Sequence, residues 1–105
     1  METEPQPNPI AQLNDAFRRS TREVILTAGV QASPDVLGLI AAVRRFDRFT
    51  PDNDSYGEHD FGSIMWESEK TFWKIDYYNQ KLEYGEDPLS PECRRVLTVM
   101  LAEEY

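Results

Sequence analysis

Residues 61–78 read FGSIMWESEKTFWKIDYY, and the expected architecture is built outward from this stretch. In its second half the apolar Trp73, Ile75 and Tyr77 alternate with charged residues. An alternation with a period of two is typical of a strand that buries one face. The polar residues between the two apolar runs indicate a turn. The prediction is a β-hairpin made of a strand, a turn and a second strand, over residues 61–66, 67–69 and 70–78.

The flanking elements are predicted from helix-start signals and apolar periodicity. Asn8-Pro9 predicts a helix start, because Asn is a good N-cap and Pro suits the first helical position. Ser33-Pro34 gives the same signal for a second helix, and apolar residues follow it at helical spacing. Ser90-Pro91 favours a C-terminal helix; a strand over residues 96–101 is the alternative, since a short apolar run fits both. Two further short strands are predicted, at residues 23–27 and 82–84.

These elements predict an α+β fold, with a small antiparallel sheet of three to four strands packed against two to three helices. The 105 residues are enough for one domain, which we place at residues 10–105. Residues 1–9 contain three prolines and are predicted to form a flexible leader. The chain has neither an apolar run long enough to span a bilayer nor a basic leader followed by an apolar run, so we expect a cytoplasmic protein with no membrane partner.

The negative charge is concentrated in the second half of the chain. The net charge is −8, and residues 51–105 carry all of it, because residues 1–50 hold equal numbers of acids and bases. Asp52–Glu69 contains six acids and no base, and Glu83–Glu92 contains four acids and no base. This balance argues against direct nucleic-acid binding, which needs clustered cations. The two acidic runs are interpreted either as a solvated surface or as an acidic face that recognises a basic protein surface.

The polar loop over residues 50–62 concentrates carboxylates, two glycines and the only histidine of the chain. Asp and Asn side chains bond their own backbone in turns, so a structural role is the leading interpretation of this loop. Two chemical alternatives remain: a divalent metal site formed by Asp52, Asp54 and Glu58, and acid–base catalysis by His59. A structural zinc site takes four Cys or His ligands, and the chain has only one Cys and one His, so it cannot form such a site. We expect no cofactor.

The aromatic second strand of the hairpin offers another candidate surface. If Phe72 and Tyr78 lie outward, they form an apolar patch of the kind enriched at protein interfaces. The residues predicted to bind a partner therefore combine the acidic loop with these two aromatic residues: Asp52, Asp54, Tyr56, Glu58, His59, Asp60, Phe72 and Tyr78.

Six segments carry a family resemblance: LNDAFR (13–18), LTAGV (26–30), FDRFTPDND (46–54), YGEHDFG (56–62), FWKIDYY (72–78) and RVLTVML (95–101). Together they resemble the bacterial domain of unknown function family 3768, over about residues 10–105. The resemblance implies a small bacterial protein, frequent in alphaproteobacteria and often encoded on plasmids or other mobile elements. It implies no known activity, so no catalytic residue is carried over from it.

The leading hypothesis is a non-catalytic, acidic protein–protein interaction module. Its expected role is to inhibit a bacterial nucleic-acid-handling defence complex, in the manner of an anti-CRISPR or anti-restriction protein that blocks a basic groove. One alternative is a small hydrolase or nuclease that uses His59 with nearby carboxylates and a divalent metal. Another alternative is a regulatory homodimer in which Phe72 and Tyr78 pair across an axis.

Overall fold

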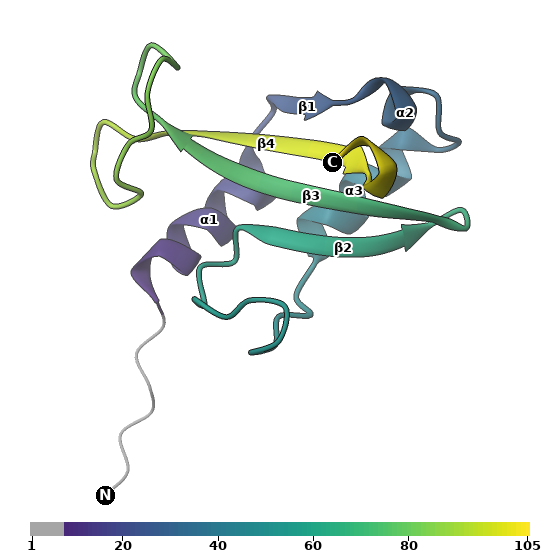
Figure 1. Cartoon of the computed structure of the whole chain (residues 1–105), viewed down its shortest axis with the longest axis horizontal. Helices are drawn as coiled ribbons and strands as arrows, with labels where there is room; N and C mark the ends of the chain where they lie inside the picture. Colours follow the sequence, from purple (N-terminus) through teal and green to yellow (C-terminus); the bar gives the residue numbers. More distant parts are fainter. Residues whose placement is uncertain (1–7) are drawn as a thin grey trace, which may run out of the picture.

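A four-stranded sheet with helices behind it organises the chain, as the computed structural model shows for residues 8–105 (Figure 1). Residues 1–7 of the predicted leader lie outside the described part of the chain, whereas Asn8 and Pro9 begin the first helix. No helix within residues 8–105 has the length and apolar character needed to cross a membrane. The elements are α1 (Pro9–Ser20), β1 (Val24–Leu26), α2 (Ala28–Gln31), α3 (Val36–Arg45), β2 (Phe61–Trp66), β3 (Glu69–Tyr78), β4 (Arg94–Leu101) and the 3-10 turn η1 (Ala102–Glu104).

The sheet has the strand order β1-β4-β3-β2 and is mixed. β2 pairs with β3 and β3 with β4 in antiparallel fashion, as predicted, but β1 runs parallel to β4. The prediction of a wholly antiparallel sheet was therefore wrong for β1. The α+β class and the strand count were predicted correctly.

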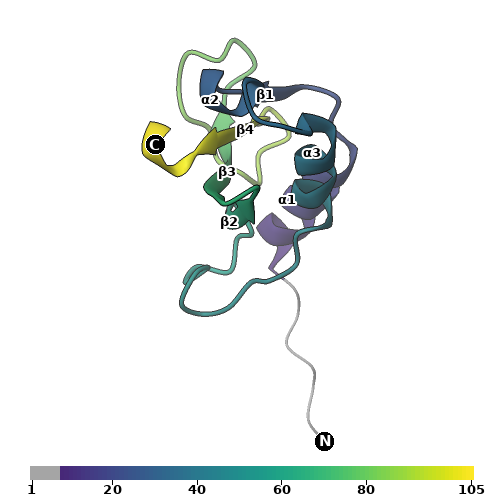
Figure 2. The same ribbon diagram turned by 90° about the vertical axis from the view of Figure 1, so that its right-hand side faces the viewer.

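Helices α1 and α3 cover one face of the sheet, which gives the domain two layers (Figure 2). The core lies between these layers, with Trp73 and Ile75 of β3 beside Leu97 and Val99 of β4. Leu39 and Val43 from α3 close the core from the helix side. Each large apolar side chain buried in this way contributes roughly 1.5–3 kcal/mol. The opposite, front face of the sheet carries Phe72, Lys74, Asp76 and Tyr78 of β3.

The predicted hairpin is confirmed, with β2 and β3 paired in register from Phe61 opposite Lys74 to Trp66 opposite Glu69. Gly62 lies opposite Trp73, and a Cβ at this position would overlap the indole ring. The turn residues Glu67 and Ser68 have φ angles of 49° and 70°. Two-residue hairpin turns with positive φ at both positions match the twist of the strands and favour Asn-Gly, so this turn is formed by residues poorly suited to it.

The predicted C-terminal helix was wrong, and the alternative strand over residues 96–101 describes this segment. β4 is an interior strand of the sheet, and its consecutive residues Val99, Met100 and Leu101 are buried. A strand buried on both faces reads as a continuous apolar run, which also fits helical spacing. The β-branched residues of the run gave the correct signal.

Three smaller predictions also need correction. The helix expected from Ser33-Pro34 begins at Val36, and its N-cap is Asp35, whose side chain accepts a hydrogen bond from the Gly38 N–H. The short helix α2 was not predicted, because four residues give no periodicity. Residues 82–84 form no strand; Tyr78 makes one isolated bridge with Gly85 instead.

We expect Ser68→Gly to raise the free energy of unfolding by about 0.5–1 kcal/mol, because Gly adopts a positive φ without steric cost. Ser63→Gly in β2 is the matched control, and there we expect a loss of about 0.5–1 kcal/mol, because Gly weakens a strand interior. Chemical denaturation measures both changes. Destabilisation by Ser68→Gly would contradict the assignment of strain to this turn.

Candidate functional site

The fully buried side chain of Arg18 links α1, α3 and the sheet. Its Nε and Nη2 donate hydrogen bonds to the carbonyl oxygens of Val43 and Phe46, at 3.0 and 2.8 Å, and its Nη1 donates to Asp15 at 3.1 Å. The guanidinium carbon lies 4.7 Å from the ring centre of Trp73. Burial lowers the pKa of Arg18 while Asp15 opposes the shift, and an arginine remains charged in such surroundings.

Asp15 also contacts His59, so the buried arginine is connected to the polar loop. The Nδ1 atom of His59 lies 3.0 Å from both carboxylate oxygens of Asp15, and its Nε2 lies 3.6 Å from Asp54. The imidazole stacks on Phe49, with ring centres 3.8 Å apart and an interplanar angle of 4°. His59 also has a φ of 56°, in the left-handed region that few residues adopt. The ring is thus held from three sides.

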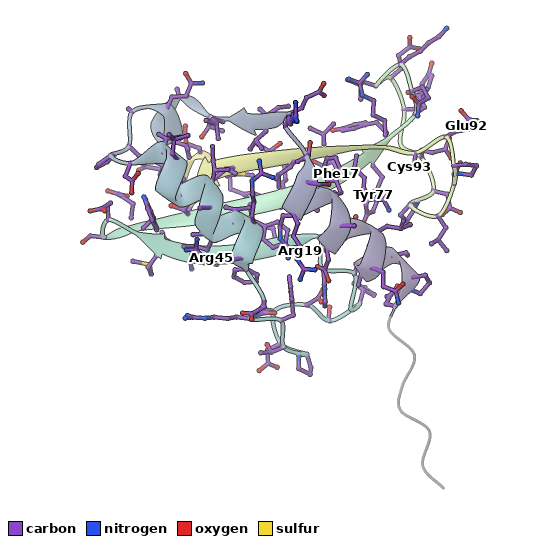
Figure 3. The ribbon with its side chains drawn as sticks, turned by 180° about the vertical axis from the view of Figure 1, so that it is seen from behind. Phe17, Arg19, Arg45, Tyr77, Glu92 and Cys93 are labelled. Carbon is purple, nitrogen blue, oxygen red and sulfur yellow. The ribbon has the colours of Figure 1, made fainter. Side chains whose placement is uncertain are left out.

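A second polar network holds the other end of the same loop. Asn14 is fully buried, and its Nδ2 donates to the Glu58 carbonyl and to the Tyr77 hydroxyl, both at 2.9 Å. Arg95 Nε donates to Asn14 Oδ1 at 2.7 Å, and the Tyr77 hydroxyl donates to the Glu58 carboxylate at 2.9 Å. Figure 3 shows Tyr77 on the helix side of the sheet, beside α1. Burial raises the pKa of Tyr77, which keeps the phenol neutral and able to donate.

These contacts show that the carboxylates of the acidic loop bind groups within the protein itself. Asp54 accepts a hydrogen bond from the His59 backbone N–H at 3.2 Å, and Glu58 accepts from Tyr77, so both carboxylates hold the loop in place. Asp60 is half-buried, and burial followed by the charge of Glu58 raises the pKa of its carboxyl. Among the predicted partner-binding residues of this loop, Asp52 and Tyr56 are the exposed ones, and Tyr56 is 86 % exposed.

The geometry gives little support to the chemical alternatives for this loop. Within residues 8–105 no three His, Cys, Asp or Glu side chains are arranged to hold a metal ion, and Asp52, Asp54 and Glu58 do not converge. His59 and Asp54 do line a shallow depression with Tyr56, but both imidazole nitrogens face carboxylates. A general base needs a nitrogen free to face the substrate. Cys93 lies before β4 rather than on a helix, and burial raises the pKa of its thiol.

Phe72 and Tyr78 share the front face of the sheet but do not form one patch. They are six residues apart on β3, which corresponds to about 20 Å. Phe72 packs against Phe61 and Tyr105, with ring centres 5.0 and 5.8 Å apart. Tyr78 is half-buried at the other end of the strand.

The acidic runs are also dispersed over the molecule. Asp52 lies in the loop that leads into β2, whereas Glu67 and Glu69 lie at the tip of the hairpin (Figure 1). The second run, Glu83–Glu92, lies in the loop at the opposite end of β3. The negative charge therefore does not form one face.

The outer edge of β2 is a feature that the sequence interpretation missed. β2 is the last strand of the sheet, and it contains no charged residue and no proline along Phe61–Trp66. Natural edge strands usually carry such residues to prevent pairing with another strand. The opposite edge strand, β1, has only three residues. The run FGSIMW could have given this signal, had the sheet order been known.

A groove of about 470 Å³ lies between this edge and the end of α3. Phe46, Ile64 and Trp66 supply large apolar groups, and Arg45 projects from the last turn of α3 beside β2 (Figure 3). The remaining lining residues are small, polar or flexible: Ala42, Asp47, Arg48, Ser63 and Met65.

Comparison with known proteins places this chain in a family. The family model described as protein of unknown function (DUF3768) matches residues 26–104. The chain belongs to the DUF3768 family. No curated protein and no solved structure matches it.

The match to DUF3768 is shorter than the resemblance predicted, because it begins at Leu26 rather than near residue 10. It includes β2, the groove and His59. It leaves out α1, which supplies Asn14, Asp15 and Arg18 to the two polar networks. An alphaproteobacterial origin and an association with mobile elements stay predictions.

Asp54→Ala removes the acceptor of the His59 backbone N–H, so we expect the free energy of unfolding to fall by about 1–2 kcal/mol. Asp52→Ala is the matched control in the same loop, and we expect a change within about 0.5 kcal/mol because Asp52 is exposed. Urea denaturation measures both. Equal losses in the two variants would show that Asp54 does not hold the loop.

Asp60→Asn tests the raised pKa of the half-buried Asp60 carboxyl. A pKa raised by folding means that the folded protein holds the proton more tightly than the unfolded chain, so stability is lost as the pH rises through that pKa. We expect the variant to be more stable than the parent at neutral pH, with a gain that shrinks in acid. Thermal unfolding across pH measures this gain, and the exposed Asp52→Asn serves as control. A gain that is unchanged in acid would refute the explanation.

Proposed function

We propose that this DUF3768 protein is a non-catalytic protein-binding module that captures an extended segment of its partner by strand addition at β2. The observation that carries the proposal is the uncharged edge of β2, unpaired within residues 8–105, beside a groove lined by both apolar and charged side chains. An exposed edge supplies main-chain hydrogen bonds to an added strand, and neighbouring pockets supply specificity for its side chains.

The register of the hairpin identifies the backbone groups that are available. The Ile75 N–H donates to the Asp60 carbonyl at 2.8 Å, so Asp60 and Ile75 form a hydrogen-bonded pair. Hydrogen-bonded and non-bonded pairs alternate along an antiparallel ladder. The N–H and C=O groups of Phe61, Ser63 and Met65 therefore point away from β3. No other hydrogen bond within the described residues 8–105 reaches them.

The side chains around this edge suit an added strand. Ile64 lies opposite Thr71, and Trp66 lies opposite Glu69. Thr71 faces the helices, and residues two apart on a strand share a face. Ile64 and Trp66 therefore both point to the helix side of the sheet. Alternate side chains of an added strand would enter the groove between this surface and Phe46. A binding role of this kind needs no cofactor and leaves the strained His59 loop as a structural support for β2.

The narrower hypothesis of an anti-CRISPR or anti-restriction inhibitor is compatible with a protein-binding module that acts in the cytoplasm. Its support is the net charge of −8. The internal contacts of Asp54 and Glu58 leave Asp52, at the loop surface, as the residue through which a basic groove would be engaged. The structure therefore gives strand addition at β2 more support than groove blocking by the acidic loop.

Ser63→Pro tests strand addition without removing a hydrogen bond of the sheet. The Ser63 N–H points to the free edge, where Pro is tolerated in strands, so we expect the variant to fold and to lose peptide binding. The probe is a phage-displayed library of random dodecapeptides selected on the immobilised protein. We expect enriched peptides that bind the parent and the conservative variant Ser63→Thr, but not Ser63→Pro.

Three outcomes would overturn the proposal. Failure to enrich any peptide, or equal binding by Ser63→Pro after circular dichroism has shown that it folds, would exclude β2 as the binding edge. A homodimer in light scattering that Ser63→Pro converts to a monomer would show that a second copy of the chain occupies this edge instead.

A further inference from the structure

We propose that the segment captured at β2 is acidic and that Arg45 and Arg48 select it through carboxylate side chains. This inference rests on the proposed function, and it adds the chemical class of the ligand. Both arginines line the groove beside β2, and both are exposed. It reverses the expectation from net charge, which pointed to a basic partner.

The arginines of this region divide into two groups. Arg18 is buried among carbonyl oxygens and Asp15, and Arg44 donates to the Arg18 carbonyl at 3.1 Å. These two side chains are committed to the fold. The side chains of Arg45 and Arg48 make no hydrogen bond and no ion pair within the described range 8–105, although the Arg48 backbone carbonyl accepts a hydrogen bond from Asn53.

The local charge of the groove differs from that of the whole molecule. Its charged lining residues are Arg45, Arg48 and the exposed Asp47, which gives a local balance of +1 against −8 for the chain. Arginine presents its donors in a planar fork that matches a carboxylate, and such charge-assisted hydrogen bonds are stronger than neutral ones. The net negative charge of the molecule repels an acidic segment at long range, but salt screens this repulsion beyond about 8 Å, so the arginines in direct contact with the segment decide its recognition.

The geometry of an added strand places the carboxylates. Successive side chains of a strand point to opposite faces, so every second residue of the ligand would face Arg45 at the end of α3 and Arg48 in the segment after it. Apolar residues at the neighbouring helix-side positions would contact Phe46 and Trp66. In the expected ligand, every second residue faces the groove. These groove-facing positions hold both acidic residues, glutamate or aspartate, and apolar residues.

The experiment compares charge composition among peptides enriched from the same dodecapeptide library. The test variant is Arg45→Gln with Arg48→Gln, and the matched control is Arg19→Gln with Arg22→Gln. Arg19 and Arg22 are also exposed, but Arg22 precedes β1 at the opposite edge of the sheet. Thermal unfolding confirms that each double variant is folded.

We expect the parent and the control variant to enrich acidic peptides, whose affinity weakens as salt is added. We expect Arg45→Gln with Arg48→Gln to bind these peptides about tenfold more weakly, because the charge-assisted hydrogen bonds to the carboxylates are lost. Synthetic versions of the enriched peptides, with glutamine in place of each acidic residue, should bind the parent protein with the same loss of affinity.

The outcomes separate this inference from the proposed function. Enriched peptides that depend on the β2 edge but show no acidic preference would overturn the inference and leave strand addition standing. An equal loss of affinity in both double variants would assign the effect to overall charge, which also overturns it. Enrichment of no peptide at all would overturn the proposed function itself.

Discussion

The buried guanidinium of Arg18 is the constraint on which the rest of the structure depends. Moving a charge out of water is expensive unless hydrogen bonds and a counter-charge replace the solvent. Here two carbonyls at the end of α3, the Asp15 carboxylate and the face of Trp73 provide that replacement. Because Val43 and Phe46 both accept from this one side chain, Arg18 fixes the point at which the chain leaves α3. The same point forms one wall of the groove beside β2.

The acidic loop belongs to the same network. Asp15 joins Arg18 to His59, and Asp54 and Phe49 hold the imidazole from other sides. Asn14 and Tyr77 fix Glu58 one residue earlier. Carboxylates that appear as free charge in the sequence are therefore used to position the start of β2. This explains why a chain with so many acids does not present an acidic face at this loop.

Local signals in the sequence were sufficient for the elements that depend on local physics. The alternation in Trp73, Ile75 and Tyr77 identified the hairpin, and Asn8-Pro9 identified the start of α1. β4 was ambiguous because its central position in the sheet makes its apolar run continuous. The parallel pairing of β1 with β4 joins segments far apart in the chain, so no local pattern encodes it. The site was harder to predict. The partners of His59 are Asp15 and Asp54 rather than its sequence neighbours. The free edge of β2 can be recognised only when the strand order is known.

The position of α1 shows that the residues matched by the family model and the residues that hold the fold together are not the same set. The part of the chain recognised as DUF3768 starts at Leu26, yet the ion that organises the interior comes from residue 18. A fragment cut at the recognised boundary would keep β2, β3 and β4 but only the last residue of β1, and would lose the donors to the carbonyls of Val43, Phe46 and Glu58. The sequence signature is thus smaller than the unit held together by these hydrogen bonds, which includes the first helix.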